Sequence, residues 1–431
     1  MAKTFRPYAP DQMLLLPPAV QDWLPENHLA RFVSDIVDSL DLSAIEDTYE
    51  EERGYPPYHP RMMVKVLVYG YCTGVYSSRR LERALLDSVA FRVLGAGNEP
   101  DFRTINDFRL RHGKALAGLF LQVLELCREA GMVKLGRVAV DGTKIKANAS
   151  KHKAMSYDRM KKAEKELKEQ VAALLAEAER VDREEDREHG KDRRGDELPE
   201  ELGRRQSRLA KIQEAKKALE NAAREKARAE GKDPDDAQPP DKAQRNFTDP
   251  ESKIQKTKDG FIQGYNAQIA VDDTNQVIVA QHVTTAGPDV QELVPILENV
   301  VKNCGEAPVI VLADAGYWSE SNADAMQAKG IDAHIAVRRQ KHGEPVPPAP
   351  RGRIPDGLTA KERMARKLAT VAGRKHYSRR KVIAEPPFGQ IKGARGFRAF
   401  LRRGMRKVSE DWAMICAAHN LLKLYGVLRP S

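Results

Sequence analysis

Hydrophobic and polar residues follow different patterns along the chain, and each pattern predicts a different kind of structure. Residues 1 to about 125 contain short apolar runs separated by Gly-rich turns, which predict a compact set of helices. The run Met62–Tyr69 is strongly apolar, and Ser77 offers a hydroxyl group that can cap a following helix. We therefore expect an all-α N-terminal domain over residues 1–130.

The middle of the chain changes to a charged helical pattern. From Met155 to Gly231, apolar positions recur three and four residues apart, and Lys and Glu fill most positions between them. This spacing predicts an inserted helical hairpin that pairs as a coiled coil. We interpret residues 151–240 as a charged coiled-coil insertion and linker. It could serve self-association, touch DNA, or be a solvated insertion with neither role.

The remaining patterns predict strands. Arg137–Val140 and Pro308–Ala313 are short apolar runs, and the second suits a buried central strand. Residues 264–271 and 276–283 alternate and are β-branched, which predicts a hairpin, and residues 288–302 fit an amphipathic helix. The resulting order predicts an α/β fold with a mixed sheet flanked by helices.

The net charge is positive but unevenly distributed. The chain has a formal charge of +10 and a pI near 9.2. Residues 335–431 hold 23 Lys or Arg against 6 Asp or Glu, a net +17, so the other 334 residues sum to −7. A positive segment of this size attracts a polyanion and raises association rates. A basic surface with no partner is the alternative, but aromatic and glycine residues at motif-like spacing favour a nucleic-acid partner.

Cysteine usage and hydropathy exclude other classes. The four cysteines lie far apart without C-x-x-C spacing, which predicts free thiols in a reducing cytoplasm and no zinc site. No apolar run approaches the roughly 20 residues that span a bilayer. We therefore expect a cytoplasmic protein with no membrane partner.

Three acidic residues stand in settings that suit catalysis. Asp141 follows Arg137–Val140, Asp314 follows Val309–Ala313, and Glu385 is one of the few acidic residues in the basic tail. Each alone could be an ordinary turn or surface residue. However, both aspartates follow strands of one predicted sheet, whose ends meet at a crevice. Oxygen ligands near a reacting phosphate suit hard divalent cations, so these acids predict a two-metal phosphodiester enzyme.

Arginines gather near the expected helix starts of the N-terminal segment. Short helices with arginines in these positions resemble a helix-turn-helix DNA reader, although ordinary helical bundles also expose arginines. The candidate DNA-contacting residues of this segment are Arg79, Arg80, Arg103, Arg109 and Arg111.

The acidic blocks resemble the three catalytic blocks of bacterial insertion-sequence DDE transposases, which have a ribonuclease H-like core. The blocks are residues 138–144, 313–317 and 377–392. The last block is similar to the tyrosine, arginine, glutamate, lysine signature of that group, with four residues instead of three between arginine and glutamate. Its members here are Tyr377, Arg380, Glu385 and Lys392. Residues 10–115 and 393–404 also resemble this family, so the similarity covers nearly the whole chain outside the charged insertion.

This resemblance implies a DNA transposase that binds the terminal inverted repeats of an insertion sequence and catalyses DNA strand cleavage and transfer. Asp141 would bridge two Mg²⁺ ions, for which Mn²⁺ can substitute, and Asp314 and Glu385 would each complete one site. The residues expected to contact DNA are Tyr377, Arg380, Lys392, Arg402 and Arg403.

The resemblance also implies partners and a domain division. The catalytic domain would combine residues 131–150 with residues 241–431. Its partners would be double-stranded terminal-repeat and target DNA, bound by a homo-oligomer in the bacterial cytoplasm near the nucleoid. Two alternatives remain: a ribonuclease H-like nuclease without strand transfer, and a domesticated DNA-binding protein that no longer binds metal.

Overall fold

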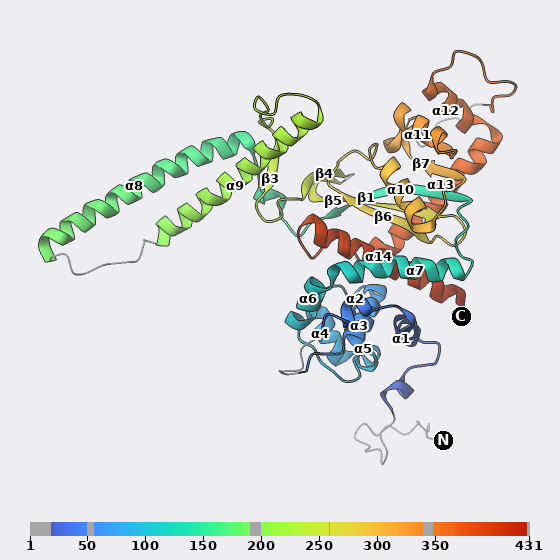
Figure 1. Cartoon of the computed structure of the whole chain (residues 1–431), viewed down its shortest axis with the longest axis horizontal. Helices are drawn as coiled ribbons and strands as arrows, with labels where there is room; N and C mark the ends of the chain where they lie inside the picture. The colour runs from blue at the N-terminus through green and yellow to red at the C-terminus, as the bar shows by residue number, and fades with distance from the viewer. Residues whose placement is uncertain (1–18, 50–55, 190–199, 258, 339–347, 429–431) are drawn as a thin grey trace, which may run out of the picture.

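A computed structural model describes residues 19–49, 56–189, 200–257, 259–338 and 348–428. They form a mixed sheet with helices on both faces, a helical N-terminal region and a long helix pair that projects away from the sheet (Figure 1). The predicted α/β class, with an all-α N-terminal region and an inserted helical hairpin, is confirmed. Within the described ranges, no helix is both long and apolar enough to cross a membrane.

The N-terminal region is a succession of short helices. Ser77 caps one of them as predicted, because its hydroxyl accepts a hydrogen bond from the backbone N–H of Arg80 at 3.2 Å. The elements are η1 (Val20–Trp23), α1 (Leu29–Ser39), α2 (Ser43–Glu46), α3 (Pro60–Thr73), α4 (Ser78–Asp87), α5 (Val89–Leu94), α6 (Phe102–Arg111) and α7 (Gly113–Glu129).

The sheet has six strands, and its centre is the pairing of two long ones. β1 (Arg137–Lys146) runs antiparallel to β5 (Gly260–Asp272) and parallel to β7 (Ile310–Ala313), which in turn pairs in parallel with β8 (Asp332–Ile335). The other edge of β5 is shared by β4 (Lys253–Thr257) and β6 (Ile278–Thr284), both antiparallel to it. The predicted hairpin is therefore β5 with β6.

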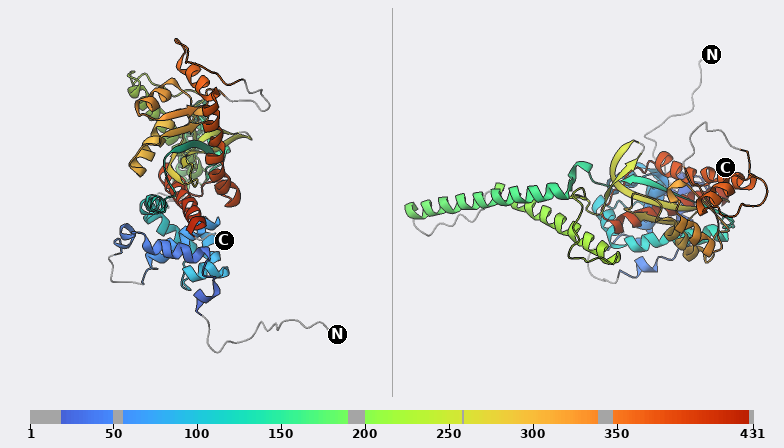
Figure 2. Two further views of the ribbon diagram at one scale, coloured as in Figure 1. Left: turned by 90° about the vertical axis from the view of Figure 1, so that its right-hand side faces the viewer. Right: turned by 90° about the horizontal axis from the view of Figure 1, so that it is seen from above.

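Helices cover both faces of this sheet (Figure 2). One face carries α10 (Leu293–Cys304) and α11 (Glu320–Ala328), and α10 begins later than the predicted Pro288 because residues 288–292 form a turn. The other face carries α13 (Val371–Gly389), the π-helical turn η4 (Gln390–Ala394) and α14 (Met405–Leu428). The 3₁₀ turn η3 (Ala315–Tyr317) follows β7, and α12 (Ala360–Ala369) lies beside β8 and α13.

The charged insertion is a helical arm. The turn η2 (Lys151–Lys153) and the two-stranded ribbon of β2 (Ala154–Ser156) and β3 (Gln244–Asn246) form its base. From this ribbon α8 (Tyr157–His189) leaves and α9 (Glu200–Ala229) returns (Figure 1). Met160, Leu167, Ile212 and Ala215 form a small apolar cluster of their own between the two helices. The apolar seam predicted from sequence is thus closed, near the base, by the partner helix of the same chain.

The N-terminal helices are fastened to α14 by buried charges. Asp411 on α14 is paired with Arg109 of α6 at 3.0 Å and with Arg402 at 2.9 Å. It also accepts a hydrogen bond from the Tyr71 hydroxyl at 2.9 Å. Burial acts to raise the pKa of Asp411, but the two guanidinium groups outweigh it and hold that pKa below its usual value. The carboxylate is therefore charged and fully partnered in the interior.

We expect Asp411→Asn to destabilise the protein by about 3–5 kcal/mol, because it removes the counter-charge of the buried Arg109 and leaves Arg402 with Glu410 alone. The midpoint of urea unfolding measures the change. Asp87→Asn is the matched control, since Asp87 pairs with Arg83 on the exposed surface of α4, and its effect should stay within about 0.5 kcal/mol. Equal unfolding midpoints for the two variants would contradict a stabilising role for this network.

Candidate active site

Asp141 lies inside a strand rather than at its end, which corrects the prediction that it closes one. β1 continues from Arg137 to Lys146 because β5 stays paired with it throughout, with Asp141 opposite Ile269. β7, in contrast, pairs with β1 only as far as Ala139. Asp141 therefore stands where the β7-side edge of β1 becomes open. Its Oδ1 accepts a hydrogen bond from the backbone N–H of Gly142 at 2.9 Å.

Asp314 directly follows β7, as the sequence pattern predicts. It caps the turn η3, because its Oδ1 accepts a hydrogen bond from the backbone N–H of Gly316 at 2.8 Å. Since β1 and β7 are adjacent and parallel, Asp314 and Asp141 both lie just beyond the point where the two strands stop pairing. Electrostatic repulsion between them is one of the effects that raise the pKa of Asp141.

Arg380 of α13 brings the third acid into this group. Its Nη1 lies 3.4 Å from Asp141 Oδ2, and its Nη2 lies 3.8 Å from Glu385 Oε1. Burial acts to lower the pKa of Arg380, yet Asp141, Asp314 and Glu385 together raise it. The three predicted acids thus meet around one guanidinium group. Tyr377, one helical turn earlier, is half-buried beside it, and burial raises the pKa of its hydroxyl.

The site holds more negative charge than Arg380 can balance. The pKa of Asp141 is raised to about 6, chiefly because the side chain is buried and also because Asp314 and Asp289 repel a further negative charge. Arg380 and the Gly142 N–H act in the opposite direction. A set of carboxylates held in this state favours the arrival of another cation.

The three carboxylates have the right oxygen ligands for a hard divalent cation, but in this structure they are too far apart to bind one together. Asp141, Asp314 and Glu385 offer only carboxylate oxygens, as Mg²⁺ and Mn²⁺ prefer. Within the described part of the chain, no three His, Cys, Asp or Glu side chains come close enough together to hold a metal ion. The guanidinium of Arg380 separates Asp141 from Glu385, so binding would require it to move aside.

Lys392 reaches the site by a route that the sequence spacing did not predict. An unbroken α-helix would place it on the same face as Glu385, but α13 ends at Gly389 and residues 390–394 form a π-helical turn. The Nζ of Lys392 donates a hydrogen bond to Thr143 Oγ1 at 2.8 Å. Thr143 and Asp141 project from the same face of β1. Lys392 is therefore aimed at the strand that carries Asp141.

The remaining predicted DNA contacts divide into exposed and internal residues. The side chains of Arg109 and Arg402 lie in the interior, where both guanidinium groups pair with Asp411. This corrects the expectation that they face DNA, since a charged side chain with a buried counter-charge is not available to solvent. Arg403 is exposed, and its Nε donates to the carbonyl of Asn148 at 2.8 Å. The exposed members of the N-terminal set are Arg79, Arg80, Arg103 and Arg111.

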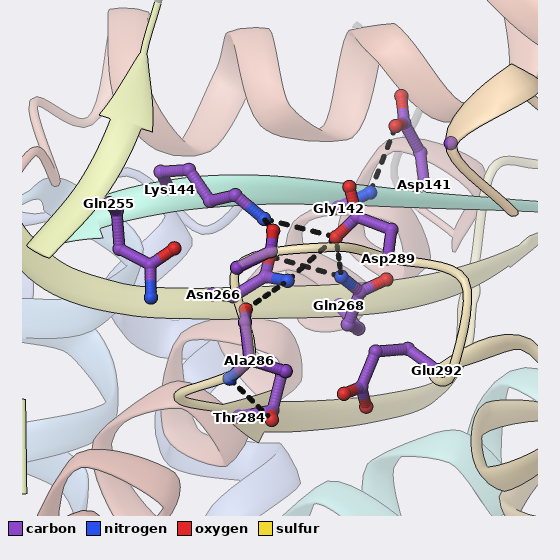
Figure 3. Close-up of polar contacts among 12 residues, drawn as sticks. Asp141, Gly142, Lys144, Gln255, Asn266, Gln268, Thr284, Ala286, Asp289 and Glu292 are labelled. Carbon is purple, nitrogen blue, oxygen red and sulfur yellow. Dashed lines mark hydrogen bonds and ion pairs between the residues drawn. The ribbon is translucent and has the colours of Figure 1, made fainter. Parts of the chain in front are cut away.

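The sequence interpretation missed one acid near the site. Asp289 lies between β6 and α10, and its Oδ1 accepts hydrogen bonds from Lys144, Asn266 and Gln268 (Figure 3). An aspartate after Gly287-Pro288 has the composition of an ordinary turn, so no local signal set it apart.

Comparison with known protein families gives two matches along the chain. Residues 18–111 match a family model described as a transposase domain (DUF772), and residues 233–421 match a family model described as a transposase DDE domain. Asp314 and Glu385 fall inside the second match, whereas Asp141 and the helical arm up to residue 232 lie between the two. No curated protein and no solved structure matches the chain.

We expect Asp141→Asn to stabilise the metal-free protein at pH 7.5, by up to about 3 kcal/mol. The folded-state pKa of about 6 lies above the usual 3.8. The ionisation of Asp141 therefore does not lower the free energy of unfolding below about pH 3.8. The free energy that it costs then grows until the pH passes about 6. The gain should thus be roughly half as large at pH 5 as at pH 7.5.

Urea unfolding in the presence of a chelator measures this gain. Asp324→Asn, an acid-to-amide change on the exposed side of α11, is the control and should have almost no effect. Loss of stability in Asp141→Asn, or a gain that does not depend on pH, would show that Asp141 is not held at an electrostatic cost.

Proposed function

The chain belongs to the insertion-sequence DDE transposases, and from this we propose that it binds the terminal inverted repeats of its own element and catalyses divalent-metal-dependent DNA cleavage and strand transfer. The observation that carries the proposal is the meeting of Asp141, Asp314 and Glu385 around Arg380. Three acids around a displaceable cation, in a chain of this family, suit phosphodiester chemistry better than a purely structural ion pair.

Asp141, Asp314 and Glu385 would hold the metal, Mg²⁺ or Mn²⁺ in two sites. When bound, the ions would lower the pKa of the attacking water or DNA 3′-hydroxyl and stabilise the leaving oxygen. Arg380 balances the carboxylates before a cation arrives and is then released to pair with a DNA phosphate. Its Nε has no hydrogen-bond partner among the described residues, which leaves a donor for that purpose. Lys392, which donates a hydrogen bond to Thr143 on the same strand as Asp141, is a second cation for the phosphates that flank the cut.

A division of labour accompanies this chemistry. Residues 1–130 would read the terminal repeat, and this range contains the first family match. Residues 131–150 and 241–431 would form the ribonuclease H-like catalytic domain, and residues 151–240 the arm. The acting form would be a homo-oligomer that holds two DNA ends. In the N-terminal set, Arg79 and Arg103 both lie over the ring of Phe102, which presents two exposed guanidinium groups together.

The catalytic proposal is tested by Asp141→Asn, Asp314→Asn and Glu385→Gln. Each removes the charge of a metal ligand while keeping its shape, so each should lower Mg²⁺-dependent cleavage by more than about 100-fold. DNA binding, followed by gel shift, should remain. The substrate is DNA from the two flanks of the reading frame, where a transposase gene has its inverted repeats.

Glu320→Gln, an exposed acid at the start of α11, is the control and should cleave normally. Near-normal cleavage by any of the three variants would remove that residue from the site. Cleavage without joined product in the wild-type protein would favour a nuclease. Binding without cleavage at any metal concentration would favour a domesticated DNA-binding protein.

Arg403 tests the phosphate track that leads away from the site. If its exposed guanidinium neutralises one phosphate, Arg403→Ala should lower the slope of log affinity against log salt by about one unit. The loss should be equal for repeat and unrelated DNA, because phosphate contacts do not read sequence. Lys302→Ala on α10, an exposed cation on the opposite face of the sheet, should leave the slope unchanged. A loss confined to repeat DNA would instead make Arg403 a base reader.

A further inference from the structure

A second polar cluster lies on the face of β1 opposite to Arg380. Its centre is Asp289, whose Oδ1 accepts hydrogen bonds from Lys144 Nζ at 3.1 Å, Asn266 Nδ2 at 2.6 Å and Gln268 Nε2 at 2.8 Å (Figure 3). Lys144 belongs to β1, whereas Asn266 and Gln268 belong to β5. One carboxylate oxygen therefore joins the catalytic strand to its neighbour.

The cluster extends to the turn that carries Asp314. The Gln268 amide oxygen accepts a hydrogen bond from the hydroxyl of Tyr317, the last residue of η3. Asn266, Gln268 and Tyr317 are almost completely buried, at 0%, 0% and 1% exposure. Buried amide and hydroxyl groups are costly unless they are partnered, so these bonds hold their geometry firmly. Asp289 thus anchors a chain of contacts that ends beside Asp314.

Two glycines let this cluster approach the acids closely. Gly142, next to Asp141, lies opposite Gln268, and a Cβ atom there would be 2.3 Å from the Gln268 amide nitrogen. Gly316 follows Asp314, and a Cβ atom there would be 3.0 Å from Asp314 Oδ1 and 3.6 Å from Asp289 Oδ2. The carboxylates of Asp314 and Asp289 thus lie within 4 Å of one common point.

We propose that Asp289 is a positioning residue of the active site: it fixes β1 and the Asp314 turn relative to each other, and its charge strengthens divalent-cation binding by Asp141 and Asp314. This inference rests on the proposed metal-dependent function. The Oδ2 atom of Asp289 faces the Asp314 turn, since a Cβ atom on Gly316 would be 3.6 Å from it, while Oδ1 accepts hydrogen bonds from three donors. Outer partners of metal ligands commonly change metal affinity by 10–100-fold. A purely structural Asp289 would instead change stability alone.

The test measures Mn²⁺ binding to the full-length, DNA-free protein by titration calorimetry. Asp289→Asn keeps an acceptor oxygen but removes the charge, and it should weaken Mn²⁺ binding by about 10-fold or more. At saturating Mn²⁺, most of the cleavage rate should return. Glu298→Gln, an exposed acid-to-amide change on the neighbouring helix α10, is the matched control and should bind Mn²⁺ like the wild type.

Tyr317→Phe is a second variant that keeps Asp289 but removes the hydroxyl group linking Gln268 to the Asp314 turn. It should also weaken Mn²⁺ binding, and it decides the case if Asp289→Asn does not fold. Wild-type Mn²⁺ affinity in a folded Asp289→Asn, or in Tyr317→Phe if the first variant is lost, would overturn the positioning role alone. A wild-type protein that binds no Mn²⁺ would overturn the proposed function together with this inference.

Discussion

Helix α14 is buried on nearly every side, and the packing of the helical region against the sheet depends on the partners that its polar residues find. Asn420 donates to and accepts from the backbone of Ile278 in β6, at 2.9 and 2.8 Å. His419 donates to the carbonyl of Gln276, and burial lowers its pKa to about 3, so it stays neutral. Asp411 faces the other way, toward Arg109 of the N-terminal region. α14 thus has polar groups bonded to the sheet on one side and to the N-terminal region on the other. Any other packing of these two neighbours on α14 would bury the polar groups without partners.

The proposed catalytic edge follows a different rule, since it brings like charges near one another and pairs them only in part. Asp141 and Asp314 lie near the end of β7, and Arg380 stands between Asp141 and Glu385. Asp289, which is paired with Lys144, adds its charge from the other face of β1. The fold tolerates this because β5 pairs with β1 from Val138 to Lys146, so Asp141 cannot move away from the other acids by unpairing its strand. Stability that the interior provides is thus given up at the place where we propose that a cation binds.

Patterns local in the sequence predicted much of this arrangement. The arm and the β5–β6 hairpin followed from periodicity, and the strand before Asp314 from a continuous apolar run; both signals report the immediate environment of each residue. What failed were features set by distant partners. β1 extends through the polar stretch after Asp141 because β5 pairs with it. Arg109 is buried because Asp411 lies 302 residues away in sequence but 3.0 Å away in space. Asp289 escaped notice for the same reason, since its importance lies in contacts from β1 and β5.

The length of the arm gives it a mechanical property that its composition does not reveal. α8 has 33 residues, so it is about 50 Å long, and among the described residues the helix pair joins the sheet through the small ribbon at its base. A tilt of about 10° at that ribbon would carry the far end of the helix through roughly 9 Å, at 1.5 Å of rise per residue. The arm is therefore a lever: a shift at its base too small to disturb the sheet becomes, at its far end, a displacement nearly as wide as the helix itself.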